Sequence, residues 1–201
     1  MLTKAHGFSK HGDTPDALLI EAALANPDAF GAIVEKYWDP LFRYVRRIGF
    51  VSAEEAEDIL QETFLNAYRK LHEYESDMKL GSWLYRIAHN QTIDTFRRAD
   101  ARPKSISLDD DEWHRLFVSA TDMERELFAK DRLAMVKRAL SRVPDRYREV
   151  LVLRFLEEKD YEEIMDILEK PKGTVATLIA RGRRILLEEL VKEDGSIKTI
   201  V

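Results

Sequence analysis

Apolar residues recur along this chain at the three- and four-residue spacing that places them on one side of a helix. A first stripe covers residues 30–48, and a second follows Ser52, which forms a capping box with Glu55. A third helix is expected from about Ser82 to Arg98, after a polar stretch from Glu73 to Gly81 that is typical of a loop. Because no alternating strand pattern of useful length occurs, we predict an all-α fold.

Prolines mark where further helices begin. Asp39-Pro40 falls within the first stripe, and we expect it to restart the helix there rather than to end it. In the carboxy-terminal half, helicity is expected to resume near Glu124, and Pro144-Asp145 starts a helix. The apolar positions of that helix are Tyr147, Val150, Leu151 and Phe155.

Residues 160–190 are typical of two helices joined by a tight turn. Asp160 and Glu163 form a capping box, and Pro171 fits a first-turn position of the second helix. That helix has an apolar side and a cationic side, the latter containing Lys172, Arg181, Arg183 and Arg184. This pattern matches a helix-turn-helix that places one helix in the DNA major groove. A helical hairpin with a solvated basic end is the alternative.

The helical pattern lapses between about Ala99 and Met123, where the sequence becomes polar and contains Pro103. Such a stretch is typical of a linker, although Trp113, Leu116 and Phe117 make it more apolar than a simple spacer. We therefore expect two small helical domains joined by a flexible linker, the second containing the helix-turn-helix.

Composition narrows the functional classes. The 201 residues include no cysteine, which excludes disulfides and thiolate metal sites and is compatible with a reducing, cytoplasmic setting. No apolar run approaches a membrane span of about 18 residues, so no membrane insertion is expected. The net charge of −5 disfavours tight independent binding to nucleic acid, which depends on phosphate neutralisation. A DNA-reading role would need a second source of affinity.

Charged residues are segregated along the chain. Acidic runs occur at residues 54–62 and 109–112, and basic runs occur at residues 97–104 and in the last helix. Alternating runs suit a protein with one basic protein partner and one nucleic-acid partner. A solvated helix face is the simpler explanation of any single run.

Three blocks in order resemble one protein family: AEDILQETFLNAYRKL, WLYRIAHNQTIDTFRR and VPDRYREVLVLRFLEEKDYEEIMDIL, the last followed by GTV. They are similar to the extracytoplasmic-function (ECF) sigma factors of bacterial RNA polymerase, within the sigma-70-like superfamily. The resemblance implies a region 2-like domain at 16–100, a linker at 101–125 and a region 4-like domain at 126–192. It also implies three partners: the largest subunits of core RNA polymerase, promoter DNA and an anti-sigma factor that holds the protein inactive until a signal arrives.

The resemblance also implies roles for individual residues. In the family the second helix docks on a basic coiled coil of the polymerase, which here points to Asp58, Gln61, Glu62 and Phe64. Phe64 is either an anchor for that partner or a core residue. The loop and third helix correspond to the element that recognises and melts the −10 DNA, with candidates Tyr74, Lys79, Trp83, Arg86, His89, Asn90, Arg97 and Arg98. For Trp83 a role in the core is the alternative. The acidic Glu75 and Asp77 leave the identity of a base captured by the loop open.

For the −35 element the candidate contacts are Lys172, Thr174, Thr177, Arg181 and Arg184. Relatives often carry cations after the GTV segment, where this chain has Ala176 and Leu178, so we expect weak or unusual reading of that element. Asp109 to Glu112 match the linker segment that occupies a basic polymerase channel in this family. A solvated tether is the alternative.

Two other classes compete with this interpretation. A stand-alone helix-turn-helix regulator would explain the last hairpin, but it would leave the acidic second helix and the aromatic, basic third helix unexplained. An enzyme would need a site, and the sequence lacks phosphate-binding glycine loops, nucleophile motifs and the repeated Glu-x-x-His of a di-iron bundle. We therefore expect no catalytic residue, no metal and no cofactor.

Overall fold

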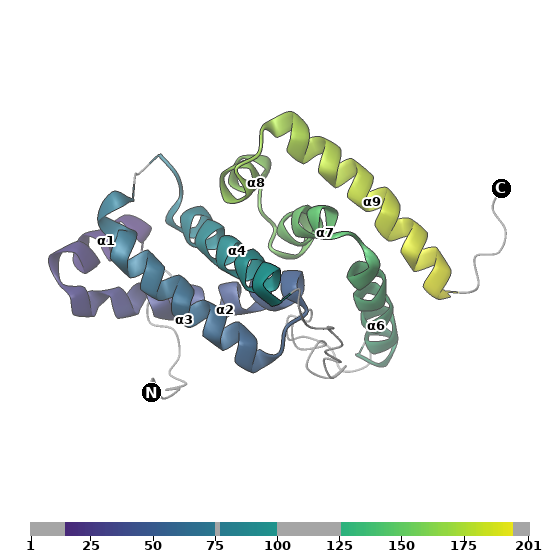
Figure 1. The fold of residues 1–201 in the computed structure, drawn as a ribbon, viewed down its shortest axis with the longest axis horizontal. Helices are drawn as coiled ribbons and strands as arrows, with labels where there is room; N and C mark the ends of the chain where they lie inside the picture. Colours follow the sequence, from purple (N-terminus) through teal and green to yellow (C-terminus); the bar gives the residue numbers. More distant parts are fainter. Residues whose placement is uncertain (1–14, 75–76, 100–125, 195–201) are drawn as a thin grey trace.

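The computed structural model describes residues 15–74, 77–99 and 126–194, and these residues form helices without a β-strand (Figure 1). The all-α prediction is confirmed. The expected linker at 101–125, including the acidic segment 109–112, lies outside the described residues, as does Glu75.

The amino-terminal unit comprises the helices that precede residue 100. Their bounds are α1 (Asp16–Ala25), the short η1 (Pro27–Ala29), α2 (Phe30–Gly49), α3 (Ala53–Lys70), η2 (Leu71–Glu73) and α4 (Leu80–Ala99). Helices α2, α3 and α4 pack on one another around fully buried side chains that include Ile33, Leu41, Leu60 and Leu84. The Ser52–Glu55 capping box forms as predicted and fixes the start of α3.

The first stripe forms one uninterrupted helix, so the expected restart at Asp39-Pro40 is wrong. Pro40 lies inside α2, where it removes one backbone donor and costs helix stability. Buried residues on both sides of it, including Ile33, Leu41 and Val45, pack into a common core. That packing holds the two halves of α2 in one helix.

The carboxy-terminal unit comprises the helices after residue 125. Their bounds are α6 (Glu126–Arg142), α7 (Asp145–Leu151), the π-helical turn η3 (Val152–Leu156), α8 (Tyr161–Leu168) and α9 (Lys172–Asp194). The Asp160–Glu163 capping box is present, and α9 begins one residue after Pro171. Phe155, expected on the apolar side, is 52% exposed because the π-helical turn changes the helical register before it.

The helix-turn-helix of α8 and α9 packs closely against α7. Gly182 lies at the α7–α9 crossing, where an added Cβ would stand 3.2 Å from Leu151 Cγ and 3.3 Å from Tyr147 Cβ. Only a residue without a side chain fits this approach without displacing its neighbours. The recognition helix is therefore held tightly on the unit.

The two units pack on each other. Helix α4 lies beside α8 (Figure 1), and the carboxy-terminal end of α2 contacts α7 and η3. We call this the closed arrangement. It places the helix-turn-helix next to α4, which carries most of the expected −10 residues.

Candidate protein and nucleic-acid interfaces

The outer face of α3 is acidic and open to solvent. Asp58, Gln61 and Glu62 are all exposed, as the sequence indicates. Leu65 and Tyr68 follow on the same face at helical spacing, and 46% and 44% of their surfaces are exposed. The combination of carboxylates and exposed apolar groups suits a partner that presents cations beside an apolar surface.

Phe64, a candidate anchor for this partner, is instead a core residue. It is 5% exposed and stacks on Trp38 with ring centroids 5.9 Å apart. The exposed apolar side chains of this face are instead Leu65 and Tyr68. They follow Gln61 by four and seven residues, and this helical spacing indicates from the sequence that they share its face.

At its amino-terminal end, α4 carries an aromatic cluster. Trp83 is partly buried and meets Tyr74 edge to face, with centroids 5.4 Å apart, while the Tyr74 hydroxyl donates to the Met78 carbonyl. About two turns beyond Trp83, Asn90 is exposed. Arg97 is also exposed, and its Nη1 lies 3.9 Å from the Asp94 carboxylate. The side chain of Arg98 lies outside the described residues. This part of α4 offers a ring for stacking, an amide and a cation.

Three other expected DNA contacts meet the carboxy-terminal unit: Lys79, which precedes α4, and Arg86 and His89 on α4. The Lys79 ammonium lies 3.5 Å from the carboxylates of Asp160 and Glu163 on the first turn of α8. Arg86 donates through Nε to the Asp166 carbonyl at 2.6 Å, and its Nη1 lies 3.4 Å from Glu169. Lys79 therefore pairs with the first turn of α8 while its side chain stays 65% exposed, and Arg86 pairs with the last turn and is partly buried.

His89 is buried between α4 and α7. It is 7% exposed, its Nδ1 lies 3.0 Å from the Tyr44 hydroxyl, and its Nε2 lies 3.9 Å from the Glu149 carboxylate. Burial, with a smaller contribution from Lys170, lowers the pKa of His89 to about 4. Burial likewise raises the pKa of Glu149 to about 7. In the closed arrangement His89 is thus a neutral, packed residue and is not available to DNA.

The candidate −35 face of α9 is fully open. Lys172, Thr174, Thr177, Arg181 and Arg184 are all exposed, while Val175 and Ile179 turn into the core. The Thr177 hydroxyl donates to the Gly173 carbonyl at 2.8 Å. Of the two positions at which the resemblance leads us to expect cations, Ala176 is exposed and Leu178 is partly buried against the core, so only Ala176 belongs to the open face.

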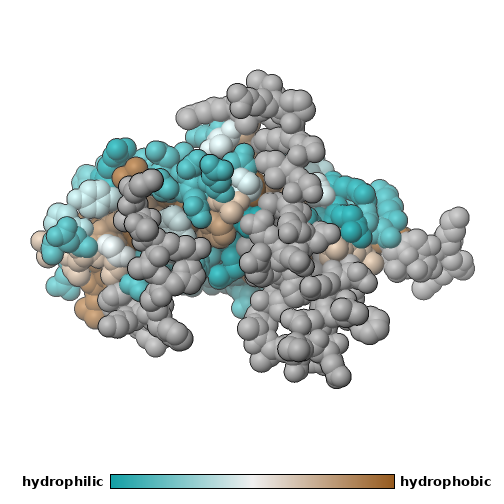
Figure 2. Space-filling view, turned by 90° about the horizontal axis from the view of Figure 1, so that it is seen from below, coloured by the Kyte–Doolittle hydropathy of each residue, from teal (hydrophilic) through white to brown (hydrophobic). Residues whose placement is uncertain are grey.

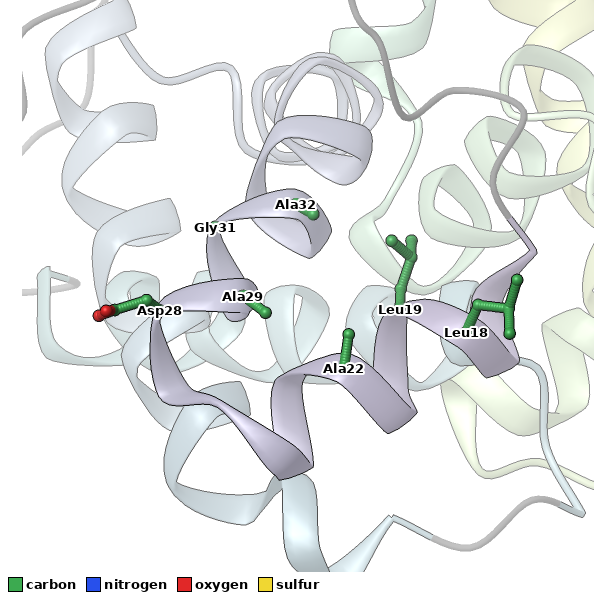
Figure 3. Close-up of a pocket in the computed structure, with 7 residues that line it drawn as sticks. All are labelled: Leu18, Leu19, Ala22, Asp28, Ala29, Gly31 and Ala32. Carbon is green, nitrogen blue, oxygen red and sulfur yellow. The ribbon is translucent and has the colours of Figure 1, made fainter.

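A shallow hollow lies at the far end of the amino-terminal unit. Figure 3 shows its lining from α1, η1 and the start of α2: Leu18, Leu19, Ala22, Asp28, Ala29, Gly31 and Ala32. In the space-filling view of Figure 2, hydrophobic residues gather at this end of the molecule. The lining is aliphatic apart from the carboxylate of Asp28, which is exposed.

Metal and membrane sites do not appear in the described part of the chain. Its His, Asp and Glu residues form no group of three or more that could hold a metal ion. Among the same residues, no helix combines the length and apolar character needed to cross a bilayer.

Comparison with known families gives two matches in the order of the two units. The family described as sigma-70 region 2 matches residues 33–102, and the family described as sigma-70, region 4 matches residues 133–186. The ECF RNA polymerase sigma factor SigW of Bacillus subtilis is 33% identical over 172 residues, which cover 81% of this chain and 89% of that protein. The ECF RNA polymerase sigma-E factor of Haemophilus influenzae is 28% identical over 86% of this chain and 93% of its own length.

Solved structures show the same fold. CnrH in complex with the cytosolic domain of CnrY matches 90% of this chain and 98% of CnrH, with a TM-score of 0.65 and 25% identity. The sigma factor RpoE of Bartonella quintana, solved with the anti-sigma factor NepR, matches 79% of this chain and 96% of RpoE, with a TM-score of 0.60 and 21% identity.

Proposed function

This chain belongs to the extracytoplasmic-function sigma factors of bacterial RNA polymerase, and we propose that its two units divide promoter recognition between them. The amino-terminal unit would bind core polymerase and melt the −10 element, and the carboxy-terminal unit would read the −35 element. We place their boundaries at 16–100 and 126–192, with a linker at 101–125.

One observation supports this division most directly. The same chain presents an exposed acidic and apolar face on α3 and an exposed cationic face on the second helix of a helix-turn-helix. The first face suits a basic protein surface, and the second suits DNA phosphates. A stand-alone regulator needs only the second face, so α3 distinguishes the two classes.

For polymerase docking we assign Asp58, Gln61 and Glu62 as the polar contacts. Their charges steer encounter with a basic coiled coil, and Leu65 and Tyr68 replace Phe64 as the apolar anchors. Because Phe64 holds Trp38 in the core, its removal would test folding rather than docking.

For the −10 element we assign stacking to Trp83 and Tyr74 and hydrogen bonding to Asn90. Phosphate neutralisation falls to Lys79, Arg86, Arg97 and Arg98. Arg86 can act on DNA only after it leaves α8, whereas Lys79 is exposed beside α8. His89 has no path to DNA in the closed arrangement.

For the −35 element we assign phosphate contacts to Lys172, Arg181 and Arg184. Thr174 and Thr177 lie on the same open face and are the candidates for reading base edges. This set is small, so core polymerase supplies part of the affinity, in agreement with the net charge of −5.

We further propose that an anti-sigma factor holds the protein inactive in the cytoplasm. The similarity to CnrH, whose structure contains the cytosolic domain of CnrY, supports such a partner. The protein acts as a binding subunit without a catalytic site or cofactor of its own, and the chemistry of RNA synthesis belongs to the polymerase.

Transcription by purified core polymerase on a library of genomic fragments tests this function. We expect the wild-type chain to direct initiation from a discrete set of fragments that share two upstream elements. The Asp58→Lys/Glu62→Lys variant should lose binding to core by about 1–3 kcal/mol, the range of important interface residues, and should lose initiation with it.

A variant with Glu21→Lys/Glu35→Lys changes charge equally on exposed positions of α1 and α2 and serves as the matched control. Equal core binding by a folded Asp58→Lys/Glu62→Lys protein and this control would contradict the assignment of α3. Initiation that does not depend on the added chain would contradict the function itself.

A further inference from the structure

The first residue of α1 is bound to α2 by two polar contacts. The Tyr37 hydroxyl donates to the Asp16 carboxylate, at 2.8 Å from each oxygen, and the Lys36 ammonium lies 2.9 Å from Oδ1 of the same group. Burial and the hydrogen bond to Asp16 raise the pKa of Tyr37, so its hydroxyl keeps its proton and remains a donor. Asp16 precedes the segment that matches sigma-70 region 2, which begins at residue 33. The contact therefore joins α1 to that segment.

Tyr37 is also packed against the start of α4. A Cβ added to Gly81, the second residue of α4, would stand 3.3 Å from Tyr37 Cε1 and 3.5 Å from the hydroxyl oxygen. Gly81 is buried, and a side chain there would force the ring or the helix to shift slightly. The ring whose hydroxyl holds Asp16 therefore lies directly against the first turn of α4.

That first turn carries the aromatic end of the candidate −10 reader. The Trp83 N–H donates to the Lys79 carbonyl at 3.0 Å, and the Trp83 ring meets Tyr74 edge to face. The Tyr74 hydroxyl donates to the Met78 carbonyl, so this ring is held by the residues that lead into α4. Burial first, and then the charge of Asp16, raise the pKa of Tyr74, which places Asp16 within electrostatic reach of both tyrosines.

A chain of contacts thus runs from α1 to the −10 reader. Asp16 holds the Tyr37 hydroxyl, the Tyr37 ring lies against Gly81, and Trp83 is two residues further along α4. We propose that Asp16 and Tyr37 are positioning residues for −10 recognition, which orient Trp83 and Tyr74 for unpaired bases without contacting DNA themselves. Because stacking depends on the orientation of the ring, loss of this support costs base discrimination rather than polymerase binding. This inference rests on the proposed −10 role of α4.

Hydrogen exchange in the free, full-length protein tests the positioning itself. Tyr37→Phe removes the hydroxyl and keeps the ring against Gly81. Tyr161→Phe is the matched control, since its hydroxyl makes no hydrogen bond within the described part of the chain. Mass spectrometry of the peptide that contains residues 80–84 should show exchange at least about fivefold faster in Tyr37→Phe than in Tyr161→Phe, as expected for one lost hydrogen bond. Equal exchange in the two variants would overturn the proposal.

Binding of single-stranded DNA by the holoenzyme tests the consequence for recognition. The probes are a fluorescent oligonucleotide with the −10 element of a recovered promoter and the same oligonucleotide with one −10 base changed. Tyr37→Phe and Asp16→Ala should bind core as the wild type does, yet lower the ratio of the two affinities about fivefold. Asp16→Asn keeps an oxygen that accepts from Tyr37 and should restore most of that ratio. An unchanged ratio, or a loss of core binding that accounts for the defect, would overturn the proposal.

A pair of glycines tests the contact from the side of α4. Gly81→Ala adds a methyl group against the Tyr37 ring, whereas Gly31→Ala adds one at an exposed helical position with nothing within 4 Å. Both substitutions favour the helix, so propensity alone does not separate them. Gly81→Ala should lower the affinity ratio at least about fivefold relative to Gly31→Ala, and equal ratios would overturn the proposal. The exchange measurement needs neither polymerase nor promoter, so it is decided separately from the proposed function, which fails if the wild-type chain starts no transcription.

Discussion

Helices α4 and α9 are both candidate DNA readers, yet the structure treats them in opposite ways. Arg86 on α4 is partly buried and paired with α8, while Lys172 and Arg181 on α9 are exposed. The difference teaches that the sequence around a cation does not decide whether that cation is free to contact DNA. Where the carboxy-terminal unit packs decides which of the two DNA faces is ready for use.

The largest expected effect lies on α4 and tests whether its aromatic end serves DNA. Trp83→Ala removes a stacking ring, worth about 1–3 kcal/mol per base, and should reduce open complex by about 5- to 150-fold while core binding persists. Permanganate reactivity of unpaired thymines measures this loss.

Asn90→Ala provides the matched test, because Asn90 is exposed and its truncation leaves the core intact. It should also lower open complex, by about 1 kcal/mol for one hydrogen bond. If Trp83→Ala melts the protein and Asn90→Ala keeps full permanganate reactivity, α4 has no role in melting.

A smaller effect comes from the buried pair His89 and Glu149. The two residues should have opposite effects on how the free energy of unfolding changes with pH. The pKa of Glu149 is raised to about 7, so the folded state gains stability as pH falls through 7 toward the carboxyl's usual range. The pKa of His89 is lowered to about 4, so the folded state loses stability as pH falls through the imidazole's usual 6.5. Groups facing the pair are Tyr44, Arg97, Asp145, Arg148 and Lys170.

Urea unfolding at pH 5 and pH 7 separates these contributions. His89→Gln should be more stable at pH 5 than at pH 7, and Glu149→Gln should be less stable at pH 5. Each slope is at most about 1.4 kcal/mol per pH unit, and the wild type should lie between them. Parallel slopes in the two variants would mean that this pair is not buried together.

The smallest effect concerns the exposed face of α9. Arg181→Ala should weaken binding of duplex DNA by the carboxy-terminal unit to a similar extent for every DNA sequence. It should also lower the slope of log K against log salt by about 0.9. Thr177→Ala should change sequence preference and leave the slope unchanged.

Titrations of polymerase holoenzyme on recovered promoters at several salt concentrations measure both quantities. If the two variants exchange phenotypes, α9 enters the groove with another face forward. If neither has an effect, promoter choice depends on α4 alone.

Local patterns predicted much of the fold. Both capping boxes, at Ser52 and Asp160, form as their spacing indicates, because a cap depends on residues three positions apart. The helix-turn-helix and its exposed cations follow from the same local periodicity. Pro40 was misjudged because its cost is offset by core contacts on both sides of it, which periodicity does not report.

The covered state of α4 could not be read from the sequence. Arg47 and Glu157 are 110 positions apart, and Arg86 meets Asp166 across 80 positions. Such contacts leave no repeat or motif, and each cation alone suggests a phosphate site. Phe64 and Leu65 show the same limit within one helix: they are adjacent and both apolar, and the packing of α3 decides which one enters the core.

A distance measurement between the two units tests the central claim most directly. Spin labels at His72→Cys and Glu162→Cys occupy exposed positions, one on each unit. The native chain contains no cysteine that would also be labelled. Double electron–electron resonance should give one short, narrow distance in the free protein and a much longer one in the open promoter complex with polymerase. A broad distribution in the free protein, or the same short distance in the open complex, would contradict the account.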